Sequence, residues 1–490
     1  MRPDLHALDG ARFDVAIIGA GINGAAAAVA AAKAGYRVAL VDKGDYGSGS
    51  SARSSRLLHC GLRYLMPGGP WTVFLRRPDR LLDAIRTIRR SMAVRSELVR
   101  GGQVNLQPVR MHYPLYRDGP YKPWMLDVAF GILGAVSDGE VPLDYRRSNP
   151  AQARRSNPFV EFLGHPEKVA SIASYTEYQF DWPERSVMDM VLQAQQLGAV
   201  TRNYTEVQAL QRDGEQWLLR LRDATGGMQA TLGADIVLNL AGAWVDQVNG
   251  RAPASPSRKV TGTKGAHLVF RLPPQCRGQG FAAMSTVNRP FYCMPWRDLH
   301  FFGPTETLYE GDLNDVRCDA TDIEFLLRET RHLFPGLGLS REHIVSTWAG
   351  IRPLTYDASL PMGHRSRRIY DLADEGMPGV YALTNGSLGA HRKTGQDVVE
   401  AMAARLPAPA PTAFREALSP GESDAIAEHV VTLEDYLARR KGWLWDADQG
   451  LDRAPQAAAE LAAKLGWSAD RTERELADYR ATVSRLYGLP

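Results

Sequence analysis

Basic and hydroxyl side chains crowd together between residues 44 and 65, in the stretch GDYGSGSSARSSRLLHCGLRYL. Serines and glycines there alternate with Arg53, Arg56, His59 and Arg63. Hydroxyl groups and flexible backbone beside cationic side chains favour a loop that wraps an anionic cofactor or substrate. An ordinary polar loop would have a similar composition, so the elements around the stretch must decide its meaning.

The residues before this loop have the pattern of a nucleotide-binding β-α-β unit. The apolar run Phe13–Gly19 is typical of a buried parallel strand, and the alanine-rich stretch 25–34 is typical of a helix packed closely on a sheet. A second apolar run, 36–41, ends on an acid. Three glycines would make the tight turn, let the backbone approach a pyrophosphate, and allow close contact of helix and strand. They are Gly19, Gly21 and Gly24.

Asp42, the acid that ends the second strand, helps to decide which dinucleotide the unit can bind. Its carboxylate is placed to accept hydrogen bonds from a ribose 2′-hydroxyl. The N-terminus of the helix offers unpaired N–H groups to the phosphates. A 2′-phosphate would be repelled by Asp42, so NADP is disfavoured. The unit by itself does not choose between FAD and NAD.

From residue 48 onward the sequence closely resembles the FAD-dependent glycerol-3-phosphate dehydrogenases. Ser48–Leu65 is similar to that family's SGTSSRSSKLIHGGLRYL, with Cys60 in place of the first glycine after the histidine. Other segments resemble family motifs in the same order: NLAGAW at 239–244, KGAH at 264–267, MPW at 294–296, GPTE at 303–306, AGIRPL at 349–354, VTLEDYLARR at 431–440 and LGW at 465–467. The resemblance implies that the dinucleotide is FAD.

The fold that the resemblance implies is α/β, with a Rossmann-type FAD-binding domain, an α+β substrate domain whose mixed sheet lies over the flavin, and a C-terminal helical domain. The FAD-binding domain is expected to be discontinuous, over 12–65, 165–257 and 345–405. The substrate domain is expected over 66–164 and 258–344. The last part, 413–490, is rich in alanine and leucine at helical spacing and follows a Pro/Ala linker at 406–412.

Within the FAD-binding domain, the sequence pattern predicts a helix over 185–197 and two alternating strands over 216–221 and 234–240.

Oxidation of a secondary alcohol requires hydride loss from carbon and proton loss from oxygen, with flavin N5 as the hydride acceptor. The resemblance puts His59 near the flavin as the acid/base group, which suits imidazole because it titrates near neutrality. Lys264 is the second catalytic candidate, as a proton partner or a charge near flavin N1, although it could instead pair with a carboxylate. Arg352 would orient the substrate oxygens. His267 and His391 are weaker acid/base candidates.

The resemblance also supplies binding residues. The expected substrate-binding set is Arg63, Tyr64, Ser387, His391 and Arg392, and the arginine fork fits phosphate oxygens in pairs. The expected FAD-binding set is Gly19, Gly21, Asn23, Gly24, Asp42, Lys43, Ser50, Ser51, Ser54, Ser55, Leu57, His59, Val207, Ala241, Gly242, Trp244, Arg352, Gly386 and Leu388.

One segment departs from the family. Where the family has GGKLTTYRK, this chain reads NGSLGAHRK over 385–393, so Ser387 replaces the lysine that helps to bind phosphate and His391 replaces the tyrosine. Loss of one charged donor from a phosphate site typically costs about 1.5–3 kcal/mol. Either His391, Arg392 or Lys393 compensates, or the substrate is not plain glycerol 3-phosphate.

The composition is that of a globular protein, with 44% hydrophobic and 23% charged residues. A net charge of +3 gives no overall field for nucleic acid, so no nucleic-acid partner is expected. No uncharged apolar run approaches the roughly 20 residues of a membrane-spanning helix, and the first dozen residues do not resemble a signal peptide. The four cysteines form no CxxC pair, so we expect no metal site and a cytoplasmic location.

The stretch 75–100 is rich in arginine and has the pattern of an amphipathic helix. Its apolar face would consist of Leu81, Leu82, Ile85, Ile88, Met92 and Val99. A basic amphipathic helix can lie on an anionic membrane, and the resemblance favours this since bacterial relatives pass electrons to membrane quinone. The alternative is a core-packed helix with a solvated basic face. The electron acceptor, quinone or oxygen, stays open.

Together these features predict an FAD-dependent dehydrogenase that oxidises the secondary alcohol of glycerol 3-phosphate, or of a related phosphorylated polyol, to the ketone. Two alternatives remain: an FAD-dependent oxidase of a different alcohol or amine, and a non-catalytic protein that uses the FAD fold as a scaffold. Retention of His59, Arg63 and Arg352 argues against the scaffold, whereas the altered 385–393 segment leaves the substrate open.

Overall fold

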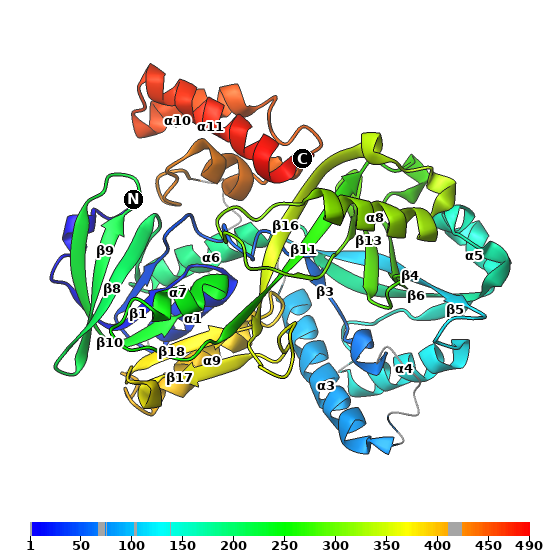
Figure 1. The fold of residues 1–490 in the computed structure, drawn as a ribbon, viewed down its shortest axis with the longest axis horizontal. Coiled ribbons are helices and arrows are strands. Elements are labelled where there is room, and N and C mark those ends of the chain that lie inside the picture. Colours follow the sequence, from blue (N-terminus) through cyan, green and yellow to red (C-terminus); the bar gives the residue numbers. More distant parts are fainter. Residues whose placement is uncertain (1, 67–73, 75, 102–104, 138, 410–423) are drawn as a thin grey trace.

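The structure, a computed structural model, describes residues 2–66, 74, 76–101, 105–137, 139–409 and 424–490. In this part of the chain the strands form two sheets, which we call sheet A and sheet B (Figure 1). The parallel nucleotide-binding strands belong to sheet A and the motif-bearing central strands to sheet B, so the two sheets together position the site.

Sheet A has the strand order β17-β18-β10-β1-β2-β7, with β9 paired to β10 and β8 to β9. Its strands are β1 (Arg12–Ile18), β2 (Val38–Val41), β7 (Val200–Arg202), β8 (Thr205–Asp213), β9 (Gln216–Asp223), β10 (Gln229–Asn239), β17 (Arg368–Asp371) and β18 (Val380–Thr384). The run from β18 to β7 is parallel, and β9 and β17 are antiparallel to it. The predicted β-α-β unit and the strand pair 216–221 and 234–240 are confirmed.

The helices α1 (Ile22–Lys33), α6 (Pro183–Gln196) and α9 (His391–Ala403) pack together over buried side chains on one face of sheet A. Small residues make this packing close. A Cβ added at Gly395 of α9 would lie 2.6 Å from the backbone of Ala26 in α1. The helix predicted over 185–197 is therefore confirmed, and it braces the nucleotide-binding helix.

Sheet B has the strand order β15-β11-β14-β13-β12-β4-β6-β3, with β16 on β11 and β5 on β6. Its strands are β3 (Leu57–Leu58), β4 (Leu106–Tyr116), β5 (Arg146–Ser148), β6 (Val169–Phe180), β11 (Val260–Phe270), β12 (Gln279–Met284), β13 (Pro290–Trp296), β14 (Leu299–Gly303), β15 (Thr307–Leu308) and β16 (Ile344–Thr355). The helices associated with sheet B are α3 (Pro78–Arg100), α4 (Pro123–Val136), α5 (Pro150–Ser156) and α8 (Ala320–Leu333). The short helix α7 (Val245–Asn249) comes after β10 of sheet A in the chain.

The expected domain bounds differ from the sheet membership at two long strands. Both β6 and β16 lie in sheet B, although the bounds 165–257 and 345–405 place them with the FAD-binding domain. The physical reason is pairing: β6 pairs with β4 from Leu106 to Tyr116, and β16 pairs with β11 over almost its whole length. A strand's own residues show which face is buried but not which strand will be its partner.

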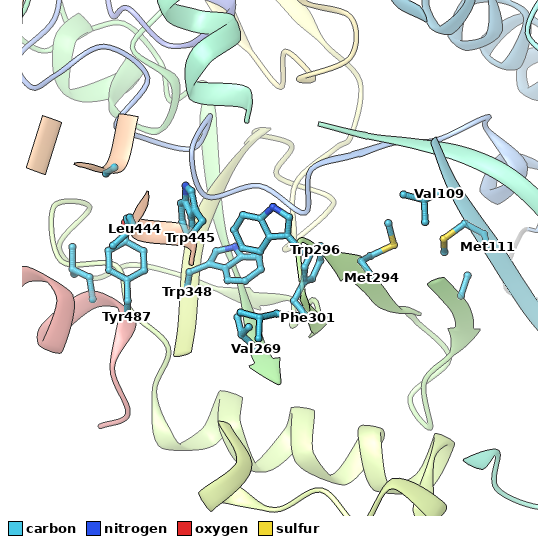
Figure 2. Packing of buried hydrophobic residues seen from close by; sticks show 14 of the residues in the cluster. Val109, Met111, Val269, Met294, Trp296, Phe301, Trp348, Leu444, Trp445 and Tyr487 are labelled. Carbon is cyan, nitrogen blue, oxygen red and sulfur yellow. The ribbon is translucent and has the colours of Figure 1, made fainter. Parts of the chain in front are cut away.

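The C-terminal part is helical, with α10 (Ala454–Leu465), α11 (Ala469–Tyr487) and a π-helical turn, Asp435–Arg440. It docks on both halves through buried contacts. Arg439 and Arg440 bind Asp45 of the 42–55 loop, each with a shortest separation of 2.5 Å. Figure 2 shows Trp445 and Tyr487 beside Trp348 of β16, with ring centroids 5.8 Å apart for the two tryptophans. This part therefore closes the cavity described below.

Within the basic stretch 75–100, residues Pro78–Arg100 form α3. This helix has features both of a core-packed helix and of a helix that could lie on a membrane surface. Its second half is packed, because Ile88 and Met92 are almost fully buried. Its first half is not, because Leu82 of the expected apolar face is 54% exposed. In the described residues, no helix is long and apolar enough to cross a membrane.

Candidate functional site

A cavity of about 640 Å³ lies between the two sheets. Its walls come from the β1–α1 turn, the 42–55 loop, the strands β11 and β16, and the segment 385–388. These are the segments that carry the sequence motifs, so the site can be followed from one end of the cavity to the other.

The nucleotide end is built from main chain that only glycine permits. Gly19 has φ +100°, and a Cβ there would lie 2.8 Å from the Ala241 Cα. A Cβ added at Gly24 would lie 1.8 Å from the Gly19 carbonyl oxygen. The N-terminal turn of α1 is fixed by Ser51, whose Oγ accepts a 3.0 Å hydrogen bond from the Ile22 N–H. The turn thus presents N–H groups to the cavity at the positive end of the helix, a suitable site for a pyrophosphate.

Asp42 ends β2 on the cavity wall, as predicted. Its carboxylate accepts hydrogen bonds from the N–H groups of Ala20 at 2.6 Å and Gly44 at 2.9 Å. Burial raises the pKa of Asp42 to about 6, against the opposing effect of these two bonds. A carboxylate has acceptor capacity beyond two bonds, so a ribose hydroxyl can still be accepted. Lys43 beside it lies 4.2 Å over the Trp244 ring.

The floor is formed where β11 and β16 pair. The Arg352 side chain crosses β11 at Gly265, where an added Cβ would lie 2.3 Å from a guanidinium nitrogen. The glycine of the KGAH motif is therefore required by the arginine of the neighbouring strand. Ser50 ties the 42–55 loop to this floor by donating to the Ile351 carbonyl at 2.6 Å.

His267 lies on the same floor and lines the cavity. Its Nε2 is 3.0 Å from the Ser55 hydroxyl, its ring stacks on Trp348 at 4.6 Å, and its Nδ1 is buried without a partner in the described part of the chain. Burial, with the charges of Arg352 and Arg56, lowers its pKa well below the ordinary value. This histidine is therefore held in its neutral form, and unlike His59 it is among the described residues that line the cavity.

His59 follows β3 and stands with two other motif residues. Its ring centroid is 5.9 Å from that of Tyr64, and Arg63 donates to the Tyr64 hydroxyl at 3.2 Å. Burial, with the Arg63 charge, lowers the pKa of His59 to about 3. His59, Arg63 and Tyr64 are not among the described residues that line the cavity. The turn that carries them is held from behind, because the Cys60 N–H donates to the buried Glu177 carboxylate at 2.7 Å.

Two arginines line this end of the cavity, and the charge of a third acts on one of them. Arg352 and Arg365 line the cavity. Burial lowers the pKa of Arg352 to about 10, and although Glu306 opposes the shift, the charges of Arg365 and Arg63 add to it. Positive charge therefore gathers around Arg352, and the carboxylate of Glu306 offsets only part of it. An anion is the ligand that relieves it.

Lys264 is not brought to this end. It precedes Gly265 on β11, so its side chain points to the opposite face of the sheet. There it pairs with Asp319 and, at 2.7 Å, with Asp322 of α8. Burial by itself would lower the pKa of Lys264, but the bonds to the two carboxylates outweigh this effect and raise it. The structure therefore agrees with the alternative stated for Lys264, in which it pairs with carboxylates, and not with a catalytic position in the cavity.

The altered segment 385–393 divides in two. Its first part lines the cavity, with Ser387 exposed there. Its second part begins α9 and leaves the cavity: His391 is buried with Nδ1 2.8 Å from the Leu388 carbonyl, and Arg392 lies 3.8 Å from Glu97 of α3. Neither His391 nor Arg392 is among the described lining residues, contrary to their expected substrate-binding roles.

Most of the expected FAD set does line the cavity. These residues are Gly19, Gly21, Asn23, Asp42, Lys43, Ser50, Ser51, Ser54, Ser55, Val207, Ala241, Gly242, Trp244, Arg352, Gly386 and Leu388. Three residues of the expected set, Gly24, Leu57 and His59, are not among the described lining residues. Gly24 packs beneath the turn, Leu57 pairs in β3, and His59 follows β3. The expected site sets did not include Arg365 or a C-terminal group, Glu434, Arg439, Thr482, Arg485 and Leu486. Glu434 and Arg439 lie in the motif-like segment 431–440, which the sequence analysis assigned to the helical domain, and no quoted motif contains the others.

Comparisons with known proteins agree with this site. The family model described as FAD dependent oxidoreductase matches residues 14–391. A glycerol-3-phosphate dehydrogenase from Synechocystis sp. is 28% identical over 414 residues, which cover 81% of this chain and 71% of the relative. An aerobic glycerol-3-phosphate dehydrogenase from Staphylococcus aureus is 27% identical over 397 residues, covering 80% of this chain and 67% of the relative.

Solved structures share the fold. The glycerol-3-phosphate dehydrogenase from Bacillus halodurans, complexed with FAD, has a TM-score of 0.73 and 19% identity, and the match covers 98% of this chain and 96% of that one. The L-alpha-glycerophosphate oxidase from Mycoplasma pneumoniae with FAD bound has a TM-score of 0.59 and 17% identity, covering 80% and 94%. The bare glycine turn, the N-terminus of α1 on the cavity wall and the cavity volume of about 640 Å³ fit FAD. The chain belongs to the FAD-dependent oxidoreductase family and takes FAD as its cofactor.

Proposed function

We propose that this chain oxidises the secondary alcohol of glycerol 3-phosphate, or of a related phosphorylated polyol, to the ketone. The observation that carries this proposal is that Arg352 and Arg365 both line the cavity, with the charge of Arg63 near enough to lower the pKa of Arg352. Guanidinium groups bind phosphate oxygens in pairs, and the carboxylate of Glu306, which pairs with Arg365, does not by itself balance these positive charges. The names of the most similar relatives support the same substrate.

When bound, FAD accepts the hydride at N5. The chain's own residues would bind the phosphate, orient the hydroxyl and remove its proton. Arg352 crosses the floor of the cavity and is placed to orient substrate oxygens. The proton acceptor must be neutral beforehand, and both His59 and His267 meet this condition since burial lowers their pKa values.

We assign proton removal to His59, with His267 as the second candidate. His59 stands beside Tyr64, which Arg63 contacts, and Arg63 and Tyr64 are the residues expected to bind the substrate phosphate. His267 lines the cavity but already bonds the Ser55 hydroxyl. The variants His59→Gln and His267→Gln separate them, because loss of the base should slow flavin reduction by about 10²–10⁴-fold.

The test of the function is anaerobic bleaching of the flavin absorbance. Glycerol 3-phosphate should bleach the flavin, whereas free glycerol and glycine should not. Bleaching by an amine alone would favour an amine oxidase. A purified chain that takes up no FAD, or one whose bound flavin no phosphorylated polyol bleaches, would contradict the proposal.

A peripheral contact with an anionic membrane on the cytoplasmic side is proposed for the exposed half of α3. Arginines are exposed there at 76, 77, 80, 86, 89 and 90. Three apolar side chains accompany them, since Leu82, Trp124 and Val128 are 54%, 55% and 44% exposed, and α4 packs against α3. This mixture of cationic and apolar groups suits a lipid surface, which would bring the reduced flavin near a quinone.

Sedimentation with vesicles tests the membrane contact. Vesicles rich in phosphatidylglycerol should carry the protein down at low salt and release it at high salt, whereas pure phosphatidylcholine vesicles should not. The charge reversal Arg89→Glu/Arg90→Glu should abolish sedimentation. Equal sedimentation of this variant and the wild type would overturn the contact, and oxygen would then be the better candidate for electron acceptor.

A further inference from the structure

Arg56 is a buried arginine in the middle of the 44–65 loop, and its backbone has an unusual conformation. Its φ is +58°, in the left-handed region that residues other than glycine rarely occupy. Such a conformation persists only where the surroundings hold it in place. Arg56 is only 1% exposed, so its side chain, and the groups packed around it, can provide that hold.

The guanidinium of Arg56 lies in a corner between two indole rings. It is 4.3 Å from the ring centroid of Trp296 in β13 and 4.4 Å from that of Trp445 in the C-terminal part. The two rings are tilted by 46°, with centroids 5.0 Å apart. A planar guanidinium stacks on such rings, and the attraction is stronger where water is excluded. Trp445 therefore joins the C-terminal part to the 44–65 loop.

Glu184, at the start of α6, binds both partners of this contact. Its Oε1 accepts hydrogen bonds from the Arg56 guanidinium at 3.2 Å and from the Trp445 Nε1–H at 2.9 Å. The side chains of Arg56 and Glu184 are 0% and 1% exposed, so the ion pair is fully buried. Loss of one member would leave buried polar groups without partners, which is costly. The three side chains therefore fix one another.

On the cavity side, Arg56 fixes the part of the loop that carries Ser55. The Arg56 N–H donates to the Ser54 hydroxyl at 3.1 Å, and its carbonyl accepts from the Phe180 N–H at 2.8 Å. The hydroxyl of Ser55, the residue between, lies 3.0 Å from His267 Nε2. Ser54 and Ser55 both line the cavity. The hold on Arg56 thus determines where Ser55 meets His267.

Trp445 also supports His267 from a second direction. Its ring centroid is 5.8 Å from that of Trp348 in β16, and His267 stacks on Trp348 at 4.6 Å. The two contacts of His267 described above, the Ser55 hydroxyl and the Trp348 ring, are therefore both backed by one indole of the C-terminal part.

The docking of the C-terminal part does not depend on Trp445 alone. Arg439 and Arg440 bind Asp45 at a separate place, each with a shortest separation of 2.5 Å. Trp445 is not among the described residues that line the cavity. A change at Trp445 can therefore loosen Arg56 while the C-terminal part stays docked.

We propose that Trp445 is a positioning residue of the flavin site: by holding Arg56 and backing Trp348, it fixes His267 at the floor of the cavity. The C-terminal part then sets the geometry of the reacting end of the site in addition to closing the cavity. The inference concerns the FAD site itself and holds for any substrate, and only its kinetic readout rests on the proposed function.

Histidine modification by diethyl pyrocarbonate, read by peptide mass spectrometry on the FAD-loaded protein, measures how firmly His267 is held without any turnover. Trp445→Leu should raise the modification rate of His267 at least about tenfold, because both of its supports are loosened and the ring opens to solvent more often. Trp443→Leu is the matched control, since Trp443 lies in the same turn but its ring is covered by Arg453 at 4.4 Å. Its rate should stay within about twofold of the wild type.

A change at Arg56 tests whether Trp445 acts through it. Arg56→Lys keeps a charge beside Glu184 but loses the planar group over the two indoles, so it should raise the modification rate of His267 at least about fivefold. Added to Trp445→Leu, it should change the rate by less than about twofold more, because residues that act through one contact are not additive. Flavin content per chain reports whether each variant is folded, and Arg56→Lys carries the test if Trp445→Leu is not.

Anaerobic flavin reduction gives a second readout. With glycerol 3-phosphate, Trp445→Leu should slow reduction at saturating substrate at least about tenfold and change KM by less than about threefold, since a displaced floor affects the transition state more than substrate binding. Trp443→Leu should reduce its flavin within about twofold of the wild-type rate.

Modification rates of His267 within about twofold of the wild type in both Trp445→Leu and Arg56→Lys would overturn the inference, as would an equal rise in Trp443→Leu. If the wild type does not oxidise glycerol 3-phosphate but the protection of His267 depends on Trp445, the proposed function fails and the positioning role stands. If oxidation occurs and the protection of His267 ignores Trp445, only the positioning role fails.

Discussion

At the nucleotide end of the cavity the contacts come from main chain and small residues within one stretch, whereas at the substrate end they come from side chains of separate segments. Gly19, Gly24 and the start of α1 shape the first end. Arg352 of β16 and Arg365 of the following connection shape the second. The two ends therefore differ in what they can tolerate.

A steric requirement of the main chain has no substitute elsewhere in the molecule. No side chain can restore the space that a Cβ would fill at Gly24, 1.8 Å from a carbonyl oxygen. A charge, in contrast, acts over several ångströms and can be supplied from any segment that reaches the cavity. This explains how the 385–393 segment can lose its lysine while the glycine turn stays unchanged.

The largest effect is expected at the nucleotide end. Gly24→Val should yield a chain without bound FAD, since the added side chain meets the Gly19 carbonyl and drives α1 away from β1. Flavin absorbance per purified chain measures it. Gly131→Ala in α4, where nothing lies within 4 Å of the added Cβ, is the control and should keep its flavin. Full flavin content in Gly24→Val would show that the turn is less constrained than its geometry indicates.

A large effect on the reaction, with the cofactor kept, is expected from Arg352→Met. The variant loses a buried guanidinium at the floor, so the rate of anaerobic flavin bleaching by glycerol 3-phosphate should fall at least about a hundredfold. Arg271→Met is the matched control, because Arg271 is exposed and pairs with Asp298 outside the cavity. Bleaching of Arg352→Met at the wild-type rate would exclude Arg352 from the substrate end.

The same contrast explains what the sequence could and could not predict. The unit β1–α1–β2 is local, and its glycines, alanines and apolar runs fix strand, helix and turn without reference to the rest of the chain. The substrate end depends on pairing between distant strands. Nothing in the residues 344–355 indicates that β16 will lie along β11, although that pairing sets Arg352 across Gly265.

Two errors at the substrate end have a physical lesson. Lys264 and His267 are three apart on one strand, so alternation sends their side chains to opposite faces, and of the two only His267 is among the described residues that line the cavity. Period-two alternation could have revealed this once the stretch was recognised as a strand. Arg365 carries no such signal, because the connection after β16 has no motif and its place follows from the bridge between Thr355 and His364.

A smaller effect, on the pH dependence of stability, is expected behind His59. Burial raises the pKa of Glu177 to about 7 from an ordinary value of 4.5, although its bonds with Cys60 and the Arg95 charge oppose the shift. The folded state therefore binds more protons than the unfolded state between these values, so this group's contribution to stability is present below pH 4.5 and is lost as the pH rises through 7.

Urea unfolding from pH 4.5 to pH 8 measures this contribution. The stability of the wild type should fall relative to Glu177→Gln over that range by roughly 3 kcal/mol, since one pKa unit is worth about 1.4 kcal/mol. Cys60→Gly is the control for the neighbouring thiol. It removes the thiol but keeps the main-chain N–H that donates a hydrogen bond to the Glu177 carboxylate. Parallel pH curves for wild type and Glu177→Gln would contradict the raised pKa.

The smallest effect on the reaction is expected from Lys264→Met, which asks whether the opposite face of β11 takes part at all. The lysine is bound to Asp319 and Asp322, so flavin bleaching by glycerol 3-phosphate should stay within about twofold of the wild type for the chain that retains FAD. Stability should nevertheless fall by about 3 kcal/mol, because Asp322 is left buried without its cation. Adding Asp322→Asn should recover part of that loss without changing the bleaching rate. A bleaching rate that drops more than tenfold at full flavin content would mean that the charge of Lys264 acts through the sheet on the flavin, and the division between the two faces of β11 would have to be abandoned.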